Sequence, residues 1–171
     1  MSTVSSTVDT PIGPFTAVVG QDGAVLASGW TGDVNELVPL IHPSLRPASV
    51  AERPELGKIT DAIRSYHAGD LQAIDAIDVN QRSGEFTQNA WRMLRTIPAG
   101  KRASYALLAR ITGHPDAIRA AATACARNPV TLFVPCHRVV RSDGTIGGFR
   151  WGLEAKRWLL DLENCQTPAL P

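Results

Sequence analysis

The chain is poor in cysteine and lacks the spacings of a metal site. Its 171 residues include three cysteines, Cys125, Cys136 and Cys165, all in the second half. A sparse, odd set is not a disulfide framework, so the sequence predicts a reducing, cytoplasmic compartment. The four histidines are scattered, and no C-x-x-C or H-x-x-x-H spacing offers zinc ligands, so we expect no metal.

Long apolar runs and a secretory leader are also missing. No apolar stretch approaches the roughly 20 residues that span a bilayer, which predicts no membrane partner. Residues 1–10 are rich in Ser and Thr and contain neither the basic nor the apolar segment of a signal peptide. We expect them to form a frayed tail.

The net charge of +1 conceals an uneven distribution. Residues 1–78 carry four Lys or Arg and ten Asp or Glu, a net charge of −6, whereas residues 79–171 carry thirteen and six, a net charge of +7. A basic half is typical of a nucleic-acid-binding domain. A solvated charged surface without a partner is the simpler alternative.

Hydrophobic patterning predicts an α/β first half and a mainly helical second half. The first half is expected to contain strands over residues 15–19 and 24–30, a mostly looped stretch with a short helix over 31–51, a helix over 54–67, a strand over 74–79 and a linker over 80–84. The second half is expected to contain helices over residues 85–96, 105–111 and 114–127, a strand over 131–134 and a helix over 154–163.

Two of these helices form a pattern of interest. Ser104 is a favourable N-cap, and helix, short Gly-containing turn and helix in a basic region are typical of a helix-turn-helix. An ordinary αα-hairpin has the same spacing. In the second helix, five of residues 117–124 are alanine, and Arg119 is the long side chain in their midst. Small side chains would help a helix about 10–12 Å wide enter a widened minor groove, normally about 6 Å wide, although alanine is also simply the best helix former.

One cysteine stands in a context that suggests chemistry. Cys136 follows the last predicted strand and directly precedes His137 and Arg138. A thiol becomes a strong nucleophile only as a thiolate, which a neighbouring cation or base favours. The alternative is a small buried core residue with a histidine beside it by chance. The short motif alone leaves both readings open.

Spaced motifs over most of residues 84–163, with a weaker match at residues 10–14, resemble the O6-alkylguanine-DNA alkyltransferase family. They are Phe86 with Trp91, Ile97-Pro98-Ala99-Gly100, Ser104-Tyr105, Arg119-Ala120, Asn128-Pro129, Pro135-Cys136-His137-Arg138-Val139, Gly147-Gly148, and Lys156 with Leu159-Leu160 and Glu163. Residues 140–144 and 149–153 are especially similar to the alkyltransferase domain of the family's bacterial adaptive-response member. The resemblance implies a ribonuclease H-like α/β domain over residues 1–80. It also implies a winged-helix-like helix-turn-helix domain carrying the active site over residues 81–171.

The resemblance implies stoichiometric DNA repair. The substrate would be O6-alkylguanine, chiefly O6-methylguanine, in double-stranded DNA, and its nucleotide would be flipped out of the stack. The alkyl group would pass to Cys136 and inactivate the protein. No cofactor is implied. The protein is expected to be a monomer, with cooperative binding to DNA left open.

The same resemblance assigns catalytic roles. Cys136 would be the nucleophile, and its proton would pass through a water to His137, which Glu163 would orient. Tyr105 would help rotate the nucleotide and stabilise the departing guanine. Asn128 would cap the turn before Cys136.

Further residues are assigned to DNA and to the guanine pocket. Arg119 would fill the gap left by the extruded base. The other expected DNA contacts are Tyr105, Ala120, Arg127 and Ser142. The expected pocket lining is Val139, Phe149 and Arg150. Phe149 stands where many members have Tyr, and Arg150-Trp151 stands where many have small residues, which puts bulky adducts such as benzyl in doubt.

Three other classes of protein fit the sequence less well. A non-catalytic protein that binds alkyl damage and flags it for another pathway would carry another residue in place of Cys136. A sequence-specific regulator would need more base-reading side chains than the Ala-rich helix provides. A cysteine hydrolase would need an oxyanion hole, for which the sequence has no signature.

Overall fold

The computed structural model describes residues 2–163, which divide into two compact units. Within that range, the first unit comprises residues 2–82 and 129–133, and the second comprises residues 83–128 and 134–163. The chain therefore passes between the units three times. Cys165 lies outside the described residues. No helix in the described range is long and apolar enough to cross a membrane.

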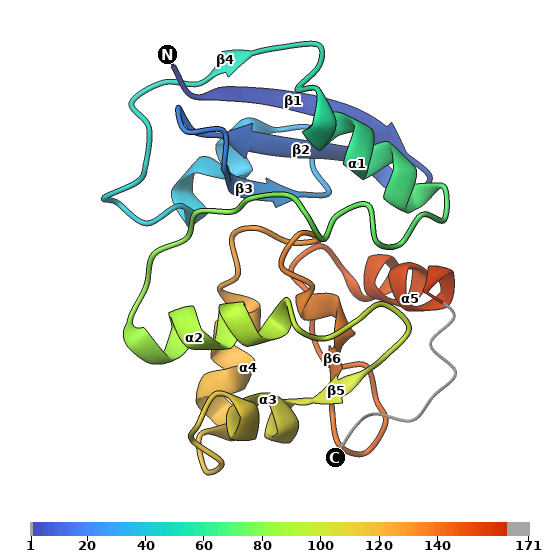
Figure 1. The fold of residues 1–171 in the computed structure, drawn as a ribbon. Helices are drawn as coiled ribbons and strands as arrows, with labels where there is room; N and C mark the ends of the chain where they lie inside the picture. The colour runs from blue at the N-terminus through green and yellow to red at the C-terminus, as the bar shows by residue number, and fades with distance from the viewer. Residues whose placement is uncertain (1, 164–171) are drawn as a thin grey trace. The chain divides into compact units, whose positions relative to one another are not determined.

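A four-stranded sheet forms the first unit (Figure 1). Its strands lie in the order β3 (Val25–Gly29), β2 (Gly13–Val19), β1 (Val4–Thr10) and β4 (Ala51–Glu52). β2 is antiparallel to both of its neighbours, and β1 is parallel to the short β4. The β2–β3 hairpin confirms the two strands that alternation predicted. The short 3-10 helices η1 (Val34–Glu36) and η2 (Val38–Leu40) lie in the stretch predicted to be mostly loop.

Strand β1 corrects the expectation that residues 1–10 form a frayed tail. The strand pairs with β2 from Val4, opposite Val19, to Thr10, opposite Gly13. Val8 is buried with 3% of its surface exposed. Val and Thr are β-branched and fit the pleated, half-buried surface of a strand. The prediction of a frayed tail had weighed only the polar character of the Ser and Thr residues.

The outer edge of β3 corrects a second prediction. A strand was expected over residues 74–79, but residues 71–76 form turns and Val79 makes only an isolated bridge with Val25. The Val25 N–H donates to Asp78 O at 2.9 Å. This segment therefore covers part of the edge without becoming a full strand.

Residues 129–133 pair with the same edge, although their neighbours in sequence belong to the second unit. The Ser28 N–H donates to Pro129 O at 2.9 Å, and the hydroxyls of Ser28 and Thr131 donate to each other's carbonyls at 2.8 and 2.7 Å. The strand predicted over residues 131–134 is wrong because the chain turns there. Leu132 adopts a left-handed φ of 81°, which is costly for a side chain with a Cβ, so its buried surroundings must hold it.

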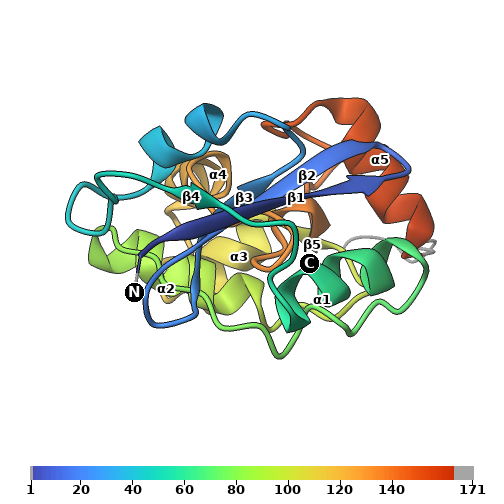
Figure 2. The same ribbon diagram turned by 90° about the horizontal axis from the view of Figure 1, so that it is seen from above.

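Helix α1 (Lys58–His67) lies against the sheet beside β1 (Figures 1 and 2). It begins four residues later than predicted, after Gly57, whose φ of 56° is not helical. His67 is buried, and its Nε2 accepts from Trp30 Nε1 at 3.2 Å. Its Nδ1 therefore carries the proton and donates to Ile63 O at 2.7 Å. Burial lowers the pKa of His67, which keeps this core ring neutral.

The second unit combines helices with a two-stranded parallel ribbon. In chain order its elements are α2 (Glu85–Leu94), β5 (Ala103–Ser104), α3 (Tyr105–Ile111), α4 (Ile118–Ala126), the 3-10 helix η3 (Cys136–Arg138), β6 (Val139–Val140) and α5 (Leu153–Leu162). The Ser104 side chain accepts from the Leu107 N–H at 2.9 Å, which confirms the predicted cap and helix. α4 begins later than predicted because Pro115 and Asp116 remain in a turn. Trp91 Nε1 donates to Ala124 O at 2.9 Å and fixes α2 against α4.

Replacing Val8 by Ala is expected to lower the free energy of unfolding by about 2 kcal/mol, because truncating this buried, branched side chain leaves a cavity in the core. Asp9→Ala, at an exposed position of the same strand, is the matched control and should change stability by less than about 0.5 kcal/mol. Urea denaturation checks both. Equal, small losses would show that β1 is not packed in the core.

Candidate active site

Cys136 is the first residue of η3, and Pro135 separates it from the turn of residues 131–134. It is almost completely buried, with 5% of its surface exposed. Burial raises the pKa of the thiol, whereas a hydrogen bond from Asn128 and the charges of Lys156 and Arg150 oppose that rise. Asn128 also donates to Val134 O at 2.8 Å, so one buried amide holds both the turn and the sulfur. The resting thiol is protonated, and a base must take its proton before sulfur can attack.

His137 and Glu163 form the neighbouring buried pair. His137 Nε2 lies 2.8 Å from Glu163 Oε2, and both side chains are fully buried. Burial raises the pKa of Glu163, but hydrogen bonds and charges from His137 and Arg138 outweigh this and hold the pKa well below its ordinary value. Burial also lowers the pKa of His137, more than Glu163 raises it. The ring is therefore neutral, with its proton on Nε2 and a basic lone pair on Nδ1.

Arg138 is a buried residue of the site that sequence reasoning did not assign. Its Nε and NH2 donate to the two oxygens of Glu163 at 3.0 and 2.9 Å, and its NH1 donates to Ile97 O at 2.7 Å. With 2% of its surface exposed, it is the permanent cation that balances the Glu163 carboxylate. Its place beside His137 in the motif was the one available signal.

Lys156 is a second buried cation without a predicted role. Its Nζ donates to Val139 O at 2.7 Å and to Gly148 O at 3.1 Å, and the residue is fully buried. Burial lowers its pKa to about 8, although the neighbouring thiols of Cys136 and Cys125 act to raise it. The ammonium therefore ties β6 to the loop that follows it and brings positive charge to the Cys136 thiol.

Tyr105, the first residue of α3, faces the same loop. A Cβ added at Gly147 would lie 2.6 Å from the Tyr105 hydroxyl oxygen, and Gly147 has a φ of 74°. Only glycine fits this approach. Burial raises the pKa of Tyr105 to about 12, with smaller contributions from the thiols of Cys125 and Cys136. Tyr105 therefore keeps its proton at neutral pH and can donate a hydrogen bond.

The structure brings Cys136, His137, Glu163, Asn128 and Tyr105 into one neighbourhood. The remaining predicted residues lie elsewhere in the second unit: Arg119 and Ala120 are exposed on α4, Arg127 is exposed as its C-cap, Ser142 is exposed in the turn after β6, Val139 is buried in β6, Phe149 is partly buried and Arg150 is exposed in the following loop. Their contacts with DNA or guanine stay predictions.

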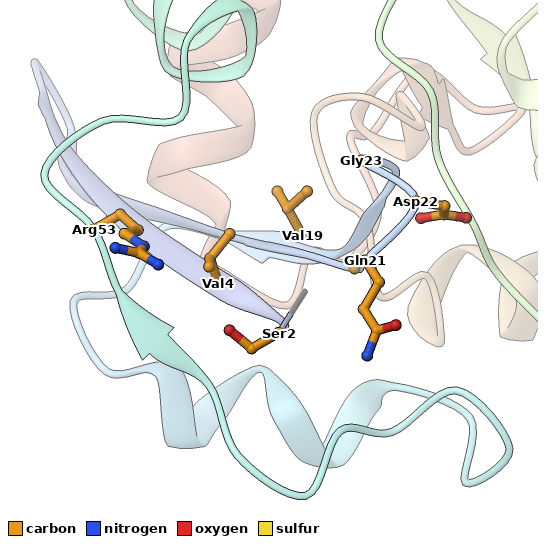
Figure 3. A pocket seen from close by; sticks show the side chains of 8 residues that line it. Ser2, Val4, Val19, Gln21, Asp22, Gly23 and Arg53 are labelled. Carbon is orange, nitrogen blue, oxygen red and sulfur yellow. The ribbon is translucent and has the colours of Figure 1, made fainter.

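A surface pocket of about 460 Å³ in the first unit offers no comparable chemistry (Figure 3). Its lining consists of Ser2, Val4, Val19, Gly20, Gln21, Asp22, Gly23 and Arg53. These residues include neither a thiol nor an imidazole, and none is a predicted site residue. Within residues 2–163, no group of three His, Cys, Asp or Glu side chains could hold a metal ion.

Known proteins resemble the chain over nearly all of its length. Residues 85–165 match the family model described as 6-O-methylguanine DNA methyltransferase, DNA binding domain. The chain is 34% identical to the methylated-DNA–protein-cysteine methyltransferase of Mycobacterium bovis over 166 residues, 95% of this chain and 93% of the relative. It is 44% identical to the Escherichia coli bifunctional transcriptional activator/DNA repair enzyme Ada over 146 residues, 85% of this chain and 38% of Ada. The crystal structure of Mycobacterium tuberculosis OGT in complex with DNA superposes with a TM-score of 0.79 at 30% identity, covering 97% of this chain and 96% of that one.

Replacing Glu163 by Gln is expected to cost about 3–5 kcal/mol of unfolding free energy at pH 7, because Arg138 keeps a buried charge without its counter-ion. The lowered pKa of Glu163 makes its contribution fully present above about pH 4.3 and lost as the pH falls from there through the folded-state value. Urea denaturation over a pH series should therefore show wild type and variant converging in acid. Glu154→Gln, on the exposed start of α5, is the matched control. A gap that persists unchanged at low pH would contradict the assignment.

Proposed function

The chain belongs to the methylated-DNA–protein-cysteine methyltransferase family, and we propose on that basis that it repairs O6-alkylguanine, chiefly O6-methylguanine, in double-stranded DNA. The alkyl group passes once to Cys136. The observation that carries the proposal is a buried thiol beside a neutral imidazole that Glu163 orients. Each molecule acts once, because thiol exchange does not reverse an S–alkyl bond.

The transfer is a displacement at the alkyl carbon. The proton of the Cys136 thiol passes through a water to His137 Nδ1, sulfur bonds to the carbon, and the C–O6 bond breaks with its electrons leaving on guanine. The Tyr105 hydroxyl, which stays protonated, stabilises the leaving anion by a hydrogen bond. Guanine then takes up a proton, and His137 releases its own to solvent. The product is S-alkylcysteine, and the steps use no cofactor or metal.

DNA is proposed to contact the exposed face of α4. Arg119 and Ala120 lie on that face, and the small side chains of this helix allow close approach to a widened minor groove. Arg119 then occupies the gap left by the flipped nucleotide. Arg127, Ser142 and Tyr105 add contacts with the backbone. The positive charge of residues 79–171 and the DNA complex of the mycobacterial relative support this placement.

We also propose a domain type for each half of the chain. The four-stranded sheet with α1 supports a ribonuclease H-like domain over residues 1–80. Helices α2, α3 and α4 with the β5–β6 ribbon support a winged-helix-like domain over residues 81–171. We propose a monomer that works in the reducing cytoplasm, where Cys136 stays a thiol. Val139, Phe149 and Arg150 line its guanine pocket.

An intact-mass experiment tests the proposed reaction. Fresh, reduced protein incubated with a duplex oligonucleotide carrying one O6-methylguanine should gain a single methyl group that maps to Cys136. Cys136→Ala should bind the same duplex and gain no mass. Binding without any mass gain in the wild-type protein would instead favour a non-catalytic protein that flags alkyl damage for another pathway.

Replacing Arg119 by Ala should slow methyl transfer from duplex DNA by roughly tenfold, or about 1.4 kcal/mol of barrier, and leave reaction with a free O6-alkylguanine base unchanged. The reason is that only the duplex requires the extruded position to be filled. Single-turnover rates with both substrates check this. Arg157→Ala, an exposed arginine of α5, is the control. Equal losses on duplex and free base would refute the role of Arg119.

A further inference from the structure

The β5–β6 ribbon ends in two neighbouring residues, Tyr105 and Arg141 (Figure 1). Its strands are parallel, and Ser104 pairs with Val140 as the last pair of the ribbon. Tyr105 follows β5 and Arg141 follows β6. Because parallel strands run in the same direction, both residues lie at the same end of the ribbon. Arg141 is therefore a neighbour of the tyrosine that is proposed to contact the DNA backbone.

The charge of Arg141 reaches groups beside the active site. Burial raises the pKa of Tyr105, and the charge of Arg141 opposes that rise. Burial lowers the pKa of Lys156, and the charge of Arg141 lowers it further, because two cations repel each other. Arg141 therefore adds positive charge to a region that already holds a buried ammonium. An anion bound beside Arg141 would relieve this repulsion.

The backbone of Arg141 is fixed, whereas its side chain is available to a ligand. Its N–H donates to Thr145 O at 2.9 Å, and its C=O accepts from the Gly144 N–H at 3.0 Å. The Asp143 carboxylate of this turn accepts from the N–H and the hydroxyl of Thr145 at 3.0 and 2.7 Å. The Arg141 side chain is exposed, and within residues 2–163 its guanidinium has no hydrogen-bond or ion-pair partner. Its N–H groups can therefore all serve an external acceptor.

We infer that Arg141 binds one of the two phosphate groups that flank the lesion nucleotide in duplex DNA. The inference rests on the proposed function and deepens it. A guanidinium matches a phosphate through two parallel hydrogen bonds, which fix its position as well as adding affinity. Arg141 thus anchors the backbone of the extruded nucleotide near Cys136, next to the contacts proposed for Tyr105 and Ser142, while Arg119 fills the gap in the stack.

A double-mutant cycle between protein and DNA tests the contact. Each duplex carries one O6-methylguanine and either natural phosphates or one neutral methylphosphonate linkage, placed directly 3′ or directly 5′ of the lesion. On the natural duplex, Arg141→Ala should slow methyl transfer at limiting protein about tenfold, as expected for loss of a charged hydrogen bond. At one of the two methylphosphonate positions, wild type should slow by a similar factor and Arg141→Ala by less than about twofold.

The matched control is Arg157→Ala, which removes another exposed arginine of the same unit, on α5. It should transfer methyl groups at the wild-type rate and respond to each methylphosphonate as wild type does. Equal slowing of wild type and Arg141→Ala at both positions would overturn the inference. So would an equal loss of reaction with the free O6-methylguanine base in Arg141→Ala, because the free base has no phosphate.

Binding measured without methyl transfer separates this inference from the proposed function. The probe is the natural O6-methylguanine duplex, and the protein carries Cys136→Ala so that no reaction occurs. Adding Arg141→Ala should reduce the slope of log binding constant against log salt concentration by about 0.9, the effect of one lost phosphate contact, whereas adding Arg157→Ala should leave it unchanged. Wild type that binds this duplex but never accepts a methyl group rejects the proposed function alone. An unchanged salt slope in the Arg141→Ala protein rejects the role of Arg141 alone.

Discussion

The ionised carboxylate of Glu163, buried away from water, is the interaction on which the second unit depends. Removing such a charge from solvent costs several kcal/mol unless partners replace the lost hydration. Arg138 supplies the opposite charge through two contacts, and its bond to Ile97 O extends the network to the segment after α2. The orientation of His137 follows from this arrangement. With Nε2 bonded to the carboxylate, Nδ1 is the ring nitrogen that can accept a proton in the proposed reaction.

The Cys136 thiol is held in its protonated, weakly nucleophilic form. Burial raises the pKa of Cys136, and the neutral ring of His137 offers a proton acceptor rather than a fixed positive charge. Lys156 provides positive charge nearby, and burial lowers the pKa of its ammonium group to about 8. This arrangement suits the proposed single-use reaction, because stray electrophiles in solution meet a buried, protonated sulfur.

Features that depend on neighbouring residues, such as helix caps, could be predicted from the sequence. Contacts between residues far apart in the sequence could not. Ser104 and the helix after it were confirmed because capping depends on neighbouring residues alone. The turn at Leu132 was mistaken for a strand because an apolar run reads the same in either conformation. The buried role of Arg138 escaped prediction since its carboxylate partner lies 25 residues away. Lys156 likewise bonds a carbonyl 17 residues away. The resemblance supplied the catalytic residues, and folding supplied the charges that support them.

Residues 129–133 belong to the first unit although they interrupt the second unit along the chain. They pair with the edge of β3 in the first unit, while the chain on either side of them belongs to the second. Each unit consists of two separate stretches of the chain, so no single cut in the sequence separates the two units. Only Val134 and Pro135 lie between the end of this segment, Phe133, and Cys136. Because Cys136 follows this segment so closely along the chain, a substitution that loosens the pairing of residues 129–133 with β3 is expected to disturb the backbone that carries the thiol.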